Sequence, residues 1–290
     1  MKKLIFSITL TIFALTNLVA QDSTLITGHV NSAATNKGIE YVNIGIRGKS
    51  FGTVSDNSGS FSLLVPDKFF KTDSLTFSCI GYKTKKLKIS EMSAPGENIV
   101  SLSPDIIRLD EVKIESKKLK SRTRGDVSRK NSIVLALSTS SMGHEIGAVI
   151  RLPGKQVYLK DFNFHIISSH PDSAKFRLNI YTYNKKIGKN ILASPIYFTI
   201  FNNASGDFTV DLTKYNLVVK NDIFVSVETV AVYTSKGPDP NKKFDQYYYD
   251  RVSISGTVLG TPSFTRKVSL DNWEKLGYSF APGFWLTVAY

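Results

Sequence analysis

The sequence predicts an all-β protein made of two antiparallel β-sandwiches joined by a basic linker. Short runs of alternating apolar and polar residues follow one another along the chain and are separated by Gly, Asn, Asp and Pro. The composition includes 13 Tyr and 18 Phe against 10 Pro and 3 Met, which favours sheets over helix bundles. No helical period persists for more than about two turns in the C-terminal half.

Length and composition bound the class of protein further. A chain of 290 residues with 42% hydrophobic and 21% charged residues is long enough for two ordinary domains and excludes wholesale disorder. The single cysteine, Cys79, excludes an intrachain disulfide framework and a Cys-based zinc ribbon. It lies in an alternating strand pattern that predicts a buried position.

Residues 1–20 are typical of a secretory signal peptide. Lys2 and Lys3 form a positive start, residues 4–15 are mostly apolar, and Ala20 before Gln21 suits cleavage. An uncleaved membrane anchor is the alternative, but the apolar run falls short of the roughly 20 residues that span a bilayer. No later stretch is long and apolar enough either. We therefore expect an exported protein without a transmembrane span, located in the periplasm, associated with the outer membrane, or secreted.

The first sandwich is expected over residues 24–104. Residues 56–59, Asp-Asn-Ser-Gly, form the clearest turn, and Gly59 and Gly81 are placed where the backbone must bend. A calcium site at this turn is the alternative, but the turn lacks the ligand count of a dedicated loop. The expected strands are seven short segments: 25–30, 39–44, 52–55, 60–65, 75–80, 85–89 and 99–102.

Four segments of this region carry a resemblance to a known family. Their order is Thr-Gly-His-Val at 27–30, Tyr-Val-Asn-Ile at 41–44, the stretch 52–61, and Phe-Ser-Cys-Ile-Gly-Tyr at 77–82. This order resembles the carboxypeptidase-regulatory-like domain, which begins many exported proteins of Gram-negative bacteria. The resemblance implies a transthyretin-like sandwich of seven strands without catalytic residues. It does not imply peptidase activity.

A basic linker is expected over residues 105–131. Between Lys113 and Lys130 the chain has eight basic residues and only two acids, within a net charge of +13. An exported protein seldom meets nucleic acid, and no helix-turn-helix or RNA-binding motif is present, so nucleic acid is not expected as a partner. Either the linker is simply solvated or it binds anionic lipopolysaccharide. The basic residues proposed for that contact are Lys117, Lys118, Lys120, Arg122 and Arg124.

Residues 132–290 predict a second sandwich of the jelly-roll kind. Alternating runs cover 162–166, 176–183, 196–201, 207–212, 223–228, 252–258 and 283–290. The strand pattern is similar to that of carbohydrate-binding jelly rolls, although the similarity is one of architecture and no diagnostic motif supports it.

The candidate binding residues of this second domain are aromatic. Tyrosines close to Asp, Asn and Arg can stack on sugar rings or anchor a protein partner. An edge strand whose alternate tyrosines pack inward is the alternative. The candidates are Tyr247, Tyr248, Tyr249, Arg251 and Trp273.

No metal or other cofactor is expected. His165 and His170 are five residues apart across a turn, so they do not share a helical face as the ligands of a zinc protease do.

The function expected from these patterns is a non-catalytic binding or assembly module of the cell envelope that recognises a glycan or a protein partner. A Gly-x-Ser-x-Gly pattern occurs at residues 48–52, but it falls in a Gly-rich turn between two expected strands and not at a strand-to-helix turn, so the case for nucleophilic catalysis stays weak. The alternative is a secreted or periplasmic hydrolase acting on glycans or peptides through the second domain. In that alternative, acids such as Asp207, Asp211 and Glu228 would converge with His144 in a cleft.

Overall fold

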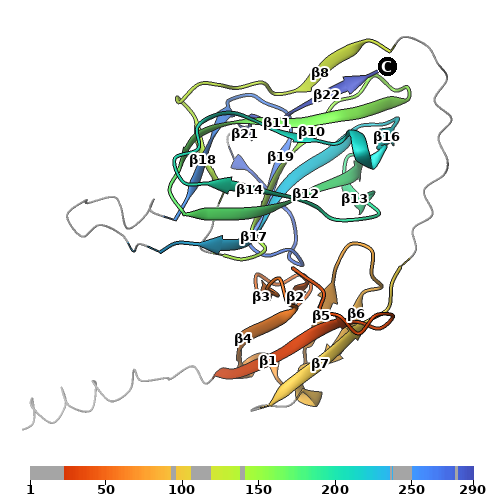
Figure 1. Ribbon diagram of the computed structural model, residues 1–290, viewed down its shortest axis with the longest axis vertical. Helices are drawn as coiled ribbons and strands as arrows, with labels where there is room; N and C mark the ends of the chain where they lie inside the picture. The colour runs from red at the N-terminus through yellow and green to blue at the C-terminus, as the bar shows by residue number, and fades with distance from the viewer. Residues whose placement is uncertain are drawn as a thin grey trace, which may run out of the picture.

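The computed structural model describes residues 23–92, 96–105, 119–137, 141–235, 237, 250–277 and 280–290. It confirms the all-β prediction, because its elements are strands and three short 3-10 turns, and it shows two sandwiches (Figure 1). The 3-10 turns are η1 (Asp67–Phe69), η2 (Ile89–Glu91) and η3 (Thr213–Tyr215). The proposed signal peptide, Lys117, Lys118 and the tyrosines 247–249 lie outside the described residues.

The first sandwich has two small sheets and all seven expected strands. The three-stranded sheet has the order β4 (Ser60–Pro66), β1 (Ser23–Ser32), β7 (Glu97–Leu102). The four-stranded sheet has the order β3 (Gly52–Val54), β2 (Asn43–Gly45), β5 (Ser74–Ser78), β6 (Lys85–Lys88). One pair differs from the antiparallel expectation: β1 and β7 run parallel. The chain reaches β7 from the other sheet, so no tight hairpin imposes an antiparallel pairing.

The core of the first sandwich explains its sequence pattern. Phe61 of β4 and Phe77 of β5 meet edge to face across the two sheets, with ring centroids 5.6 Å apart. Cys79 is buried in the same core, as expected, and burial raises the pKa of its thiol. Gly59 and Gly81 both adopt positive φ, at 91° and 85°, which confirms their role at the two bends.

The second sandwich consists of a seven-stranded and an eight-stranded sheet. The first contains β13 (Ile187–Asn190), β12 (Ser173–Tyr183), β17 (Ile223–Tyr233), β10 (Glu145–Ile150), β19 (Ser263–Arg266) and β20 (Glu274–Lys275), with β14 (Ile196–Phe201) beside β12. The second contains β21 (Ala281–Pro282), β18 (Val252–Thr257), β11 (Val157–Ser169), β22 (Trp285–Ala289) and β8 (Ser121–Gly125), with β15 (Gly206–Asp211) and β16 (Val218–Val219) on β11 and β9 (Val134–Leu137) on β18.

Aromatic side chains fill the space between these two sheets. Phe162 and Phe164 of β11 point inward and pack on Phe284, with ring centroids 5.0 and 6.0 Å away. Phe176 of β12 stacks on Phe198 of β14, in the seven-stranded sheet. One continuous core therefore covers the inner face of the seven-stranded sheet and leaves its outer face to the first sandwich.

The linker boundary differs from the expectation. Residues 121–125 form β8, which pairs with β22 at the edge of the eight-stranded sheet, so these residues belong to the second sandwich. Arg124 contacts Tyr290, with its guanidinium 5.4 Å from the ring centroid. A basic composition here marks a charged edge strand, a common way to keep sheet edges from pairing with other chains.

The β2–β3 end of the first sandwich lies against the outer face of the seven-stranded sheet (Figure 1). The Ser50 hydroxyl donates to Asp271 at 2.5 Å, and the backbone N–H of Gly48 donates to the carbonyl of Leu270 at 2.8 Å. The rings of Tyr41 and Tyr197 meet edge to face at 5.2 Å. The two domains are therefore packed together by polar and apolar contacts.

No helix in the described part of the chain is long and apolar enough to span a bilayer.

Candidate functional site at the domain interface

The outer face of the seven-stranded sheet carries a row of charged residues. Phe176, Leu178 and Ile180 of β12 belong to the core of the second sandwich. Because side chains alternate along a strand, Arg177 and Asn179 lie on the opposite face. This face meets the first sandwich and contains most of the buried charge of the described residues.

Strand register places four charges in line across four neighbouring strands. Arg177 of β12 lies opposite Glu228 of β17. Glu228 lies opposite Glu145 of β10, and Glu145 lies opposite Arg266 of β19. The order of charge is therefore positive, negative, negative, positive, with an overall charge of zero.

The first ion pair is bidentate. The Nε of Arg177 donates to Oε2 of Glu228 at 2.8 Å, and one terminal nitrogen donates to Oε1 at 2.7 Å. The hydroxyl of Ser269 donates to the same carboxylate. Arg177 and Glu228 are each only 1% exposed, so the pair is fully removed from water.

The second ion pair lies beside the first. Arg266 donates from Nε to Oε2 of Glu145 at 2.8 Å, and its guanidinium stacks on Trp273 at 4.3 Å from the ring centroid. The other oxygen of Glu145 accepts from Tyr181 at 3.1 Å and from Ser226.

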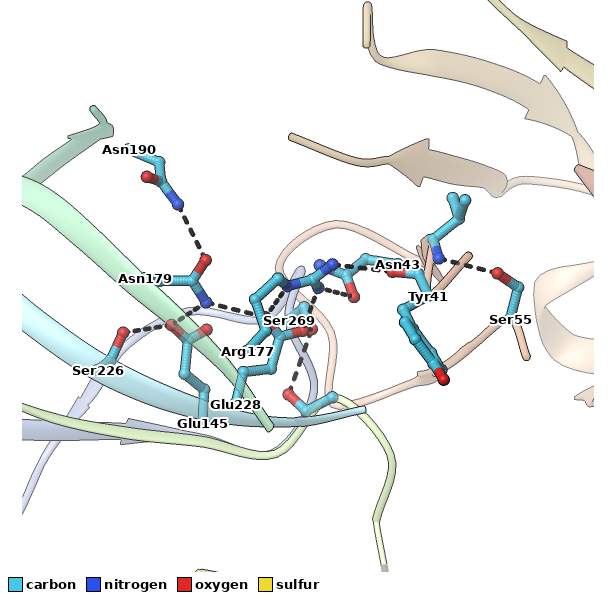
Figure 2. A network of polar contacts seen from close by, with 12 residues as sticks. Tyr41, Asn43, Ser55, Glu145, Arg177, Asn179, Asn190, Ser226, Glu228 and Ser269 are labelled. Atoms are coloured by element: carbon cyan, nitrogen blue, oxygen red, sulfur yellow. Dashed lines mark hydrogen bonds and ion pairs between the residues drawn. The ribbon is translucent and has the colours of Figure 1, made fainter. Parts of the chain in front are cut away.

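Asn179 connects the two carboxylates. Its Nδ2 donates to Oε1 of Glu145 and to Oε2 of Glu228, both at 2.9 Å, and its own Oδ1 accepts from Asn190 at 3.0 Å (Figure 2). A neutral donor between two negative groups reduces their mutual repulsion. The network is therefore satisfied on every side that the described residues show.

The first sandwich completes this network. One terminal nitrogen of Arg177 donates to the backbone carbonyl of Tyr41 at 2.8 Å, and the other donates to Oδ1 of Asn43 at 2.7 Å. Figure 2 shows Tyr41 and Asn43 at the end of the Arg177 side chain, on the side away from Asn179. Removing the first sandwich would leave these N–H groups without their partners.

The electrostatics of the network follow from its burial and its pairing. Burial by itself would raise the pKa of Glu228, but the adjacent Arg177 outweighs it and keeps that pKa below the ordinary value. Burial lowers the pKa of Arg177, and the Glu228 carboxylate reverses this, so the guanidinium stays charged. Burial also raises the pKa of Tyr181 well above its ordinary value. At neutral pH the Arg177–Glu228 pair is therefore charged and the Tyr181 phenol beside it is neutral.

Two adjacent carboxylates suggest acid–base chemistry, but their surroundings point to a structural role. A catalytic carboxyl must reach substrate, and both Glu145 and Glu228 are sealed and hold their hydrogen-bond partners. An interdomain cavity of about 470 Å³ is lined in part by Ser50, Met142 and His144, and neither glutamate lines it. We assign the network to holding the domains together.

The acids named for the hydrolase alternative do not lie together. Asp207 and Asp211 lie on β15 of the eight-stranded sheet, whereas Glu228 lies on the outer face of the seven-stranded sheet. Asp207 pairs with Arg129 and accepts from His165, and Asp211 accepts from a neighbouring threonine in a local turn. The alternation in the sequence assigned each acid correctly to a strand, but the strands belong to different sheets.

His144 lies beside Glu228 in the sheet, because its carbonyl accepts from the backbone N–H of Thr229 at 2.9 Å, but its side chain contacts Thr265. Its Nε2 lies 3.2 Å from the hydroxyl of Thr265, and burial lowers the pKa of its imidazole. Within the described residues no group of three or more His, Cys, Asp and Glu side chains could hold a metal ion. At the 56–59 turn, Asp56 instead accepts from the backbone N–H groups of Ser58 and Ser60 at 2.8 and 2.9 Å.

The structure places two of the five candidate binding residues. Trp273 packs edge to face on Phe224 at 4.9 Å and carries the guanidinium of Arg266 on its ring. It is part of the aromatic cluster beside the charged row and is only partly exposed. Arg251 lies at the start of β18 and is partly exposed, and its carbonyl accepts from the backbone N–H of His170. Of the proposed lipopolysaccharide contacts, Lys120 and Arg122 are exposed.

Sequence reasoning missed the charged row. The alternation of residues 176–183 already places Arg177 and Asn179 on one face, which is a usable signal. The partners Glu145, Glu228 and Arg266 are far away in the chain, so only the strand register brings them together.

Comparisons with known proteins bear on the two domains differently. A family model described as the CarboxypepD_reg-like domain matches residues 26–114. No curated protein matches the chain.

Among solved structures, the clostridial cysteine protease Cwp84 after propeptide cleavage is 9% identical, with 92% of this chain and 70% of that chain covered and a TM-score of 0.37. The structure of the cysteine protease and lectin-like domains of Cwp84, a surface layer associated protein of Clostridium difficile, is 9% identical. The match covers 94% of this chain and 60% of that chain, with a TM-score of 0.38. The structure of infectious bursal disease virus Gt strain is 13% identical. The match covers 92% of this chain and 63% of that chain, with a TM-score of 0.27.

These structural similarities are too weak to support a function. The family match is of another kind, because it begins within β1, covers β2 to β7, and agrees with the motif order in the sequence. Over residues 26–114, less than a third of the chain, the sequence is therefore similar to the carboxypeptidase-regulatory-like domain.

Proposed function

We propose that this protein is a non-catalytic binding or assembly module of the bacterial cell envelope that recognises a glycan or a protein partner. One observation carries the proposal. The buried carboxylates of the second sandwich are used to fix the regulatory-like domain in place, through the Arg177 contacts to Tyr41 and Asn43. A buried ionic network that joins two domains supports a rigid platform for binding better than it supports turnover.

Export is part of the proposal. The pattern of residues 1–20 supports secretion across the inner membrane, with Gln21 as the mature N-terminus. In an envelope location the net charge of the mature chain, +13 less Lys2 and Lys3 and so +11, favours acidic glycans, lipopolysaccharide or acidic proteins as partners. N-terminal sequencing of the exported protein tests this, and recovery of an intact Met1 form in the cytoplasm would contradict it.

The binding proposal is tested with the mature chain from Gln21. A glycan array and a pull-down from an envelope fraction should identify a ligand, and the variants Tyr248→Ala and Trp273→Ala should weaken that binding. Tyr233→Ala is the control, because Tyr233 is an aromatic residue of the same domain that is 65% exposed and outside the proposed set.

Three outcomes decide the proposal. Binding that both variants retain would remove the aromatic site while leaving the function. Absence of binding to any glycan or envelope protein would overturn the function. Hydrolysis of an arrayed glycan or of a peptide by the wild-type chain would overturn its non-catalytic part.

A further inference from the structure

Figure 1 shows β13 and β16 at one end of the second sandwich. Two adjoining cavities of about 440 and 590 Å³ lie there. They share four lining residues, Tyr183, Asn184, Asn221 and Asp222, so they adjoin, and we refer to the two together as the groove. Each volume lies within the ordinary range of ligand pockets, about 300 to 1,000 Å³.

The floor of the groove is apolar and its rim is polar. The first cavity is lined in part by Ile191, Leu217, Val219 and Ile223, which belong to the core of the sandwich or pack against it. The exposed amides of Asn184 and Asn221 lie at the rim. An apolar floor with a few convergent polar groups is the usual design of a small-ligand site.

A fixed arginine stands over this rim. Arg151 donates to Oδ2 of Asp222 at 2.5 Å, and the backbone N–H of Leu152 donates to Oδ1 at 2.9 Å. The guanidinium lies 6.0 Å from the ring centroid of Tyr183. Its remaining N–H groups have no partner within the described residues and its side chain is 60% exposed, so they are open to a ligand.

The charge of the groove is positive. Lys185 and Lys220 are exposed at the rim, and neither forms an ion pair with any residue that the structure describes. The acid of the groove, Asp222, is already paired with Arg151. An anionic ligand would therefore meet the unpaired ammonium groups of Lys185 and Lys220 and those N–H groups of Arg151 that Asp222 does not bind.

We propose that this groove binds an acidic oligosaccharide, that is, a glycan bearing sugar carboxylates. The proposal rests on the binding function proposed above, names its ligand class, and places that ligand in the groove as a site separate from the candidate Trp273, which does not line it. A sugar ring presents a C–H face to Tyr183 and the apolar floor, and its hydroxyls match the amides of Asn184 and Asn221. Its carboxylate matches the planar fork of Arg151.

Titration calorimetry with the mature chain tests the assignment. The probes are tetragalacturonic acid and, as a neutral counterpart, cellotetraose. We expect the acidic probe to bind and the neutral probe to bind at least about tenfold more weakly, with the difference shrinking as salt is raised. Lys220→Glu and Arg151→Gln should each weaken the acidic probe by about ten- to a hundredfold, the range for one charged hydrogen bond.

Lys86→Glu is the matched control, since it makes the same charge change at an exposed position of the first sandwich. Equal loss in Lys220→Glu and Lys86→Glu would overturn the site, because the effect would then be one of net charge. A thermal melt checks that Arg151→Gln remains folded without its ion pair to Asp222.

Phosphate is the competing anionic group, and vesicles containing phosphatidylglycerol test whether it replaces the sugar carboxylate. Tighter binding to these vesicles than to the acidic probe, lost in Lys220→Glu, would overturn the sugar assignment. If the acidic probe fails while another glycan or an envelope protein binds the wild-type chain, this inference fails and the proposed function stands. If nothing binds, both fail.

Discussion

Arg177 is the residue on which the domain interface depends. Its guanidinium is shared between Glu228 in its own domain and the Tyr41 carbonyl and Asn43 amide in the other. Burying two ions costs several kcal/mol each, and only good geometry and full hydrogen bonding offset that cost. Removing one partner leaves the other charged and buried.

The first prediction concerns the buried charge that remains when one partner of this ion pair is removed. Arg177→Met should lower the free energy of unfolding by about 3 to 5 kcal/mol, because Glu228 loses its counter-ion. Urea unfolding followed by circular dichroism measures this. Lys88→Ala, which breaks an exposed ion pair with Glu91, should change stability by about 1 kcal/mol or less.

A double variant completes that test. Arg177→Met combined with Glu228→Gln removes both charges, so it should recover part of the lost stability. A double variant as unstable as the sum of its single changes would show that the two residues act independently and would contradict the pairing argument.

Acid should destabilise the protein in two steps. Burial lowers the pKa of His144 below 6.5, so the unfolded chain takes up a proton first and stability falls as the pH drops below about 6.5. Burial raises the pKa of Glu228, but Arg177 lowers it below 4.5 overall, so that contribution is present above 4.5 and is lost at lower pH. Urea midpoints measured across this range should show both windows.

Single substitutions identify the source of each window. His144→Gln should flatten the step that begins near pH 6.5 and leave the step below 4.5. The same change at His29, on the outer face of β1, is the control. A step near 6.5 that persists in His144→Gln would assign it to another group.

At the scale of elements, alternation in the sequence was sufficient for strands that pack on one face. All seven strands of the first sandwich and the long strands β11, β12 and β17 follow from period-two patterns. The central strand β10 was missed because every side chain in it is buried, including Glu145, so no alternation is visible. The charged face was visible in part, at Arg177 and Asn179, but strand register is a tertiary property.

Gly147 explains how β10 fits its central place. A methyl group at this position would lie 2.5 Å from the carbonyl oxygen of Val225 and 2.6 Å from the Phe224 ring. Gly147→Ala should therefore destabilise the protein by about 1 to 3 kcal/mol through overpacking. Gly277→Ala, where a methyl group would meet nothing within 4 Å, is the control. Equal thermal midpoints for the two variants would contradict the close approach.

At the scale of the whole molecule, the interface decides whether the two sandwiches unfold together. The small first sandwich buries a lower fraction of its surface than the second, so alone it is the less stable unit. Docking adds the apolar contact of Tyr41 and Val54 with Val230, in addition to the Arg177 hydrogen bonds. These contacts should join two unequal domains into one cooperative transition.

The two tryptophans allow that coupling to be measured, because both lie in the second sandwich. In a Trp273→Phe background, Trp285, 7% exposed, reports the second sandwich alone, whereas far-ultraviolet circular dichroism reports both. Urea transitions from the two signals should coincide in this background. Adding Arg177→Met should separate them, with circular dichroism changing first as the undocked first sandwich unfolds. Transitions that already separate without Arg177→Met, or that still coincide with it, would show that the buried charged row does not couple the domains.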